Sequence, residues 1–156
     1  MRKLAAIFGA AAALALVIAC AVSPDVAVAQ TITDSERAAV AGPWNGIWTG
    51  KGFRYQAHMT LNVMANGEID GMIEWTLLVS PRPSEAGKIG MKGIEYVRGR
   101  FNPAAAVLNF EGYRKDDPNV ILGLDRYRLV VSEQYKSMGG ITASGGGWDS
   151  QFYLSR

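Results

Sequence analysis

Side chains that could do acid–base chemistry are few in this sequence and lie far apart. His58 is the only histidine, and Asp116 and Asp117 are the one adjacent pair of carboxylates. A general base needs a nucleophile or a second acid at a matching position. The sequence has no serine elbow, Cys/His pair, phosphate-binding loop or metal-ligand spacing. We therefore predict a protein that is not an enzyme, with no catalytic residue, no metal site and no cofactor.

The charged candidates each have a simpler structural interpretation. His58 is expected to lie outward, opposite Glu74, as an ordinary cross-strand pair. Asp116 and Asp117 are expected to stabilise a polar turn over residues 114–119, through Asx-turn bonds and pairing with the neighbouring basic residues. Arg126 and Arg128 share the outward side of a strand, where they would be solvated or would grip an anionic partner.

Aromatic residues offer a more informative set. Large rings fill a small eight-stranded barrel as readily as they line a cavity in it, so two interpretations stay open. One places all four tryptophans in the core: Trp44, Trp48, Trp75 and Trp148. The other makes Trp48, Tyr55 and Trp75 the lining of an apolar ligand pocket near the barrel mouth.

Two long strands must position these rings. Odd positions from Phe53 to Val63 are all apolar and even positions are polar or charged, and residues 69–79 repeat the alternation. This period of two indicates strands with one buried face. A three-residue loop, Ala65-Asn66-Gly67, brings the two apolar sets together, whereas a two-residue turn would bury an acid. We predict a left-handed Gly67 in a bulged turn.

Similar patterns divide the rest of the chain. Thr33 and Glu36 form a capping box for a short helix ending near Val40, and a two-residue turn, Lys51-Gly52, sets Trp48 beside Tyr55. Residues 80–92, with two prolines, are expected to form a long loop at the rim. Further strands are expected over 44–50, 94–101 with a bulge near Tyr96, 107–113, 120–132 with a kink at Gly123, 138–144 and 148–154. On the last of these, Trp148, Ser150, Phe152 and Leu154 share one face.

Eight short strands joined mostly by tight turns predict an all-β fold, an eight-stranded antiparallel up-and-down barrel with a short N-terminal helix. The barrel domain would span residues 44–156, after a helix and linker over 30–43. Sixteen basic residues against 14 acidic ones form no basic stripe, so a nucleic-acid partner is not expected.

Residues 1–29 are predicted to be an export signal. Arg2 and Lys3 precede an apolar run, and Ala27-Val28-Ala29 offers a small-x-small cleavage site. An alternative is a lipoprotein signal over 1–19 with Cys20 lipidated, which would give the only contact with a membrane. The mature protein would then be periplasmic or secreted, or else a lipid-anchored envelope protein.

A first strand carrying Gly46-x-Trp48, followed by an antiparallel meander that ends near Arg156, resembles the calycin barrels such as lipocalins and avidins. The resemblance implies that Trp48 sits at the barrel base, covered by Arg156. The aromatic inner face, the rim loop and the lack of a catalytic constellation lead us to predict a non-catalytic module that binds a small apolar or aromatic ligand in or near the barrel mouth. The rival hypothesis is a filled barrel whose outer surface binds a protein or another envelope component, as an inhibitor or assembly factor.

Overall fold

The computed structural model describes residues 32–156. The predicted signal segment, its cleavage site after Ala29 and the alternative lipidation at Cys20 lie outside these residues, so they stay predictions. Within 32–156, no helix is both long enough and apolar enough to cross a membrane.

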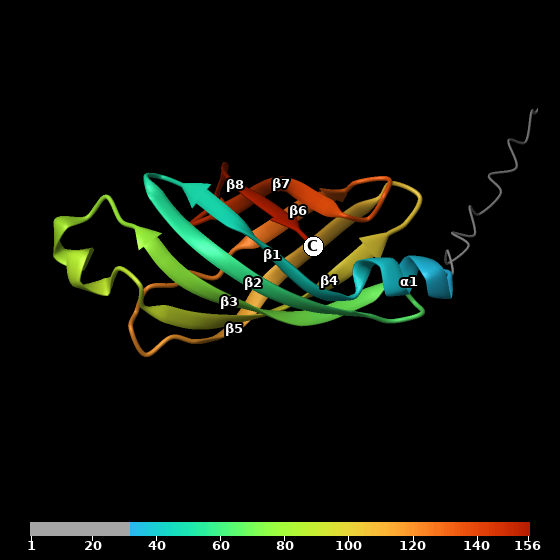
Figure 1. Cartoon of the computed structure of the whole chain (residues 1–156), viewed down its shortest axis with the longest axis horizontal. Helices are drawn as coiled ribbons and strands as arrows, with labels where there is room; N and C mark the ends of the chain where they lie inside the picture. Colours follow the sequence, from blue (N-terminus) through green and yellow to red (C-terminus); the bar gives the residue numbers. More distant parts are fainter. Residues whose placement is uncertain (1–31) are drawn as a thin grey trace, which may run out of the picture.

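Eight antiparallel strands, each hydrogen-bonded to the next along the chain, close into a barrel when the last pairs with the first (Figure 1). The predicted fold class is therefore confirmed. One short helix, α1 (Asp34–Val40), precedes the barrel, and a 3₁₀ helix, η1 (Pro83–Lys88), lies in the long loop. The strands are β1 (Gly42–Gly50), β2 (Phe53–Val63), β3 (Glu68–Val79), β4 (Lys92–Asn102), β5 (Val107–Asp116), β6 (Arg126–Val131), β7 (Ser137–Ser144) and β8 (Gly147–Ser155).

The β2–β3 hairpin has the register that burial of its apolar face requires. Val63 pairs with Ile69, Ala57 with Trp75 and Tyr55 with Leu77. The Met64 N–H donates to the carbonyl of Glu68, and Gly67 is left-handed with φ 82°. The β1–β2 turn is also as predicted, since Trp48 pairs with Tyr55.

One end of the barrel is plugged by α1 and its surroundings. Thr33 and Glu36 form the predicted capping box, and Val40 at the helix end is fully buried. The indole N–H of Trp44 donates to the Val40 carbonyl at 2.9 Å, and the Arg156 guanidinium lies over the Trp44 ring, 3.7 Å from its centroid. Trp44, not Trp48, is thus the base tryptophan that Arg156 covers, because β1 enters the barrel from this end.

The prediction of one strand over 120–132 is wrong for the first half of that segment. Only Arg126–Val131 forms β6, while residues 117–125 leave the sheet as an irregular loop. Asp117 accepts hydrogen bonds from the backbone N–H groups of Ile121 and Leu122, and this local alternative to a ladder holds the loop. The polar turn predicted at 114–119 starts later than expected, because β5 runs to Asp116.

The predicted bulge near Tyr96 is present in the β4–β5 pairing, but the extra residue lies on β5. Tyr96 pairs with Arg114 and Val97 with Gly112, which leaves Tyr113 without a partner across the ladder. The inward face of β4 consequently does not change parity. Every odd position from Gly93 to Val97 is buried, and one of them is Glu95.

Trp148 does not share the buried face of β8. Its side chain is 46% exposed, although Ser150, Phe152 and Leu154 point inward as predicted. The β7–β8 register shifts between Thr142 and Ser144, next to the glycine-rich turn, and Trp148 packs outside under the guanidinium of Arg126.

Candidate functional site

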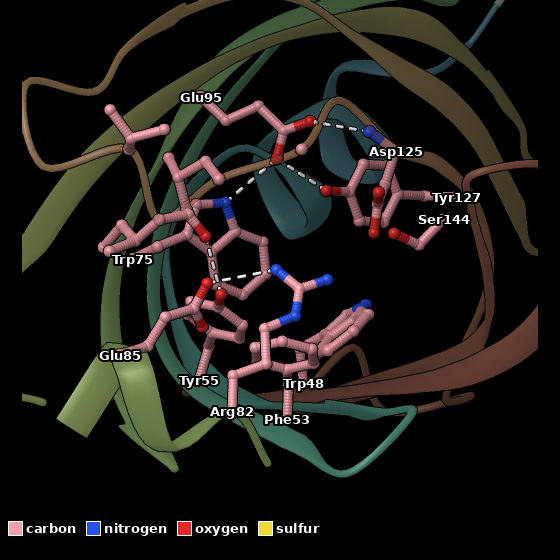
Figure 2. Close-up of a pocket in the computed structure, with 14 residues that line it drawn as sticks. Trp48, Phe53, Tyr55, Trp75, Arg82, Glu85, Glu95, Asp125, Tyr127 and Ser144 are labelled. Carbon is pink, nitrogen blue, oxygen red and sulfur yellow. Dashed lines mark hydrogen bonds and ion pairs between the residues drawn. The ribbon is translucent and has the colours of Figure 1, made fainter. Parts of the chain in front are cut away.

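The loop that carries η1 lies at the end of the barrel opposite α1 (Figure 1). A cavity of about 350 Å³ opens at this end, and Figure 2 shows the residues that line it. At this end lie the C-terminal ends of β1, β3, β5 and β7, together with η1 and the loop 117–125. The lining residues are Trp48, Phe53, Tyr55, Trp75, Arg82, Glu85, Glu95, Val120, Ile121, Leu122, Gly123, Asp125, Tyr127 and Ser144.

Trp48, Tyr55 and Trp75 come together in the cavity lining, one from each of three neighbouring strands. Tyr55 meets the other two rings edge-on, with centroid distances of 5.7 Å to Trp48 and 6.0 Å to Trp75. The Trp48 indole donates to the Thr142 hydroxyl at 2.7 Å, and the Tyr55 hydroxyl donates to the Ile121 carbonyl at 2.6 Å. These hydrogen bonds fix the orientation of the Trp48 and Tyr55 rings.

A buried carboxylate, Glu95, stands beside this aromatic wall. It accepts hydrogen bonds from the Trp75 indole at 2.9 Å, the Tyr127 hydroxyl at 2.6 Å and the Asp125 backbone N–H at 3.1 Å. Gly112 faces it from β5, where a Cβ would overlap the carboxylate. Burial raises the pKa of Glu95 to about 7, although the three donors favour the charged form.

Asp125 contributes a second carboxylate, at the point where the loop 117–125 enters β6. Its side chain is only 9% exposed, and Figure 2 shows it next to Ser144, on the far side of the cavity from Trp75. Burial raises the pKa of Asp125 to about 6, while the Ser144 hydroxyl and the charge of Lys51 act in the opposite direction. Within residues 32–156, no cationic nitrogen lies within 4 Å of this carboxylate, since Lys51 pairs with Asp149 instead.

Two loops cover the mouth. In the rim loop over 80–92, Glu85 accepts from the Ser80 hydroxyl and forms an ion pair with Arg82 at 3.0 Å. The Lys88 ammonium donates to the carbonyl of Val120 in the loop 117–125. The mouth is therefore bordered by two irregular segments, and this hydrogen bond joins them.

The sequence predicted the three aromatic residues but described their pocket as apolar, and this was incomplete. Glu95 was missed because Ile94 and Tyr96 suggested the opposite inward parity on β4. Asp125 was missed because an aspartate was not expected on the buried face of a strand, although it shares the parity of the inward Tyr127 and Leu129. A signal was available in each case: Gly93, Val97, Gly99 and Phe101 share the parity of Glu95, and Pro118 and Gly123 disfavour a continuous strand.

The other candidates lie outside the cavity. His58 is exposed on the outer face, where it pairs across the ladder with Glu74 and hydrogen-bonds Asn45. Arg126 and Arg128 are exposed as predicted. Asp117 has the expected turn role, with Lys115 as its ion-pair partner at 3.3 Å. Across the described residues, no three His, Cys, Asp or Glu side chains are grouped to hold a metal ion.

Comparisons with known proteins bear on the fold. No family model matches the chain, and no curated protein matches it either. Among solved structures, the chain is similar to a redesigned β-barrel, mFAP0, bound to DFHBI. The TM-score is 0.54 at 12% sequence identity, over 76% of this chain and 99% of that one. At this identity the likeness supports a shared barrel architecture and no shared residue roles.

Proposed function

We propose that this protein is an exported, non-catalytic calycin-type barrel that binds a small ligand with an aromatic or apolar body in the cavity at its mouth. The observation that carries the proposal is the cavity of about 350 Å³, which lies in the size range of small-molecule sites. Its walls also have the usual composition of such sites: several aromatic rings and a few placed polar groups.

Two further observations support the barrel type and the ligand class. Arg156 across the ring of Trp44 corresponds to the base arrangement that the calycin resemblance implies, four residues earlier on β1 than expected. The similar barrel mFAP0 is bound to DFHBI, a small molecule. Export rests on the charged start and cleavage site of residues 1–29.

Binding of the neutral dye N-phenyl-1-naphthylamine tests the proposal. Its fluorescence should rise when it enters the cavity, with micromolar affinity. A cavity-filling change, Gly123→Phe, should abolish this signal. A Cβ at Gly123 would have only the side chains of Asp125 at 3.6 Å and Ser144 at 3.9 Å as near neighbours, so the ring has room to enter without displacing a packed group.

Ile141→Phe is the matched control, because it adds a ring to an exposed position on the outer face of β7. Dye affinity should stay within about twofold of the unmodified protein. Both variants should keep the far-ultraviolet circular dichroism of a β protein. Absence of dye binding to the unmodified protein, or equal binding by Gly123→Phe, would contradict a ligand site in this cavity.

A further inference from the structure

The charges of the cavity are unbalanced. Three carboxylates belong to its lining: Glu85, which pairs with Arg82 at the rim, and the buried Glu95 and Asp125. The only basic side chain among the lining residues is Arg82, which is 65% exposed, pairs with Glu85 and lies over the Phe53 ring. Beneath the Arg82–Glu85 pair, the cavity lining therefore includes acidic side chains but no basic side chain.

The two buried carboxylates, Glu95 and Asp125, differ in the partners that the protein gives them. Glu95 is buried, and both of its carboxylate oxygens already accept hydrogen bonds from the protein. Asp125 is about nine-tenths buried and receives no ion pair from the described residues; the Ser144 hydroxyl is its side-chain hydrogen-bond partner. A buried charge without a partner is costly. A ligand that brings a positive charge would remove that cost.

The ring faces and edges around the carboxylates suit the same kind of ligand. Trp48, Tyr55 and Trp75 form adjacent walls, and the faces of aromatic rings attract ammonium and guanidinium groups. Ile121 and Leu122, two apolar side chains of the loop 117–125, also line the cavity. A flat body would pack against these surfaces while its charged nitrogen reaches Asp125.

We propose that the cavity selects an organic cation, a protonated amine or amidine on a flat aromatic or apolar body, with Asp125 as its counter-ion. This inference rests on the proposed ligand-binding function and names the ligand class. An anionic ligand is disfavoured because it would place a third negative charge beside Glu95 and Asp125. The nearest other cation, Lys51, is held outside by the Ser144 carbonyl at 2.8 Å and by Asp149 at 3.4 Å.

Three naphthalene compounds of nearly equal size separate charge from shape: 2-naphthylmethylammonium, 2-naphthylmethanol and 2-naphthoate. Isothermal titration calorimetry at pH 7.5 measures their affinities for the unmodified protein. The cation should bind at least about tenfold more tightly than the neutral alcohol, as a charge-assisted hydrogen bond in a buried site requires. The carboxylate should bind most weakly. At this pH Asp125 is mostly ionised, since burial raises its pKa only to about 6.

Asp125→Asn should remove the preference, bringing the cation and the alcohol to within about twofold of each other while the alcohol keeps its affinity. Asp116→Asn is the matched control, because it removes an exposed acid that lies outside the cavity lining. This control should retain most of the preference.

The outcomes separate the two proposals. An alcohol that binds as tightly as the ammonium compound overturns the cation inference and leaves a ligand site in place. Retention of the preference in Asp125→Asn overturns the role of Asp125. Failure of all three compounds and of N-phenyl-1-naphthylamine to bind overturns the ligand site itself.

Discussion

The two ends of this barrel are built from the same strands, yet one is a plug and the other a cavity. Trp44 and Trp48 lie four residues apart on β1, and both point inward. At the base, Trp44 is enclosed by Val40, whose carbonyl accepts its indole N–H, and by Arg156, whose guanidinium lies over its ring. At the mouth, Trp48 borders a space that also contains Glu95 and Asp125.

The difference teaches that strand periodicity alone does not decide whether an inward ring is core or lining. What covers each end decides it. At the base the cover is a helix with a complete capping box, whose last residue is fully buried. At the mouth the cover is two irregular loops that bring backbone groups, acids and small apolar side chains, and they do not fill the space. Stability should accordingly come from the base and binding from the mouth.

The strongest test of this division compares one ring from each end. Trp44→Ala should lower the free energy of unfolding by about 3–5 kcal/mol, because it empties a fully buried site and removes the donor to Val40. Phe53→Ala, at the half-buried rim, should cost only about 1 kcal/mol but weaken binding of N-phenyl-1-naphthylamine. Urea denaturation followed by circular dichroism measures both losses. Equal losses for the two variants would contradict the division.

The mouth should also be less stable at neutral pH than in mild acid. The pKa of Asp125 is raised from 3.8 to about 6 in the folded state, so the folded protein binds this proton more tightly than the unfolded chain does. The destabilisation caused by ionising Asp125 in the folded protein is absent below pH 4, grows as the pH rises to about 6, and is complete above that. Asp125→Asn should therefore stabilise the protein by about 2–3 kcal/mol at pH 8 and have little effect at pH 4.

Unfolding of both proteins by urea at pH 4, 6 and 8 checks this expectation. The groups that face Asp125 are Ser144, Lys51, Asp149 and Glu95, and all of them are retained in the variant. A difference that is constant with pH would show that the Asp125 carboxylate is not desolvated as described.

Sequence reasoning predicted the features that follow from local rules. The period of two, together with the need to bury one face, specified the β2–β3 register through Ala57 opposite Trp75. The capping box at Thr33 and the left-handed Gly67 depend on a few neighbouring residues. Such features need no knowledge of what lies across the barrel.

The features that were missed depend on contacts that the alternation of residues along one strand does not encode. Glu95 is inward because Trp75, Tyr127 and the Asp125 backbone donate to it and because Gly112 leaves it room. These groups come from four other segments: β3, β5, β6 and the loop 117–125. The loop 117–125 leaves the sheet because Asp117 satisfies its backbone, with Val120 in a left-handed conformation that is unusual for a β-branched residue. The sequence pattern shows the parity of Glu95 and the breaks at Pro118 and Gly123, but it does not show these contacts.

The smallest expected effect concerns the cover of the plug. Arg156→Gln should lower the free energy of unfolding by about 1 kcal/mol, because it removes the cation over the Trp44 ring and two hydrogen bonds to the carbonyls of Val40 and Ala41 at 3.2 Å. Arg128→Gln, an exposed change on the outer face of β6, should cost less than about 0.5 kcal/mol. Since Arg156 lies at the base, neither variant should change the affinity for N-phenyl-1-naphthylamine. A loss of dye binding in Arg156→Gln without a comparable loss of stability would mean that the two ends are coupled.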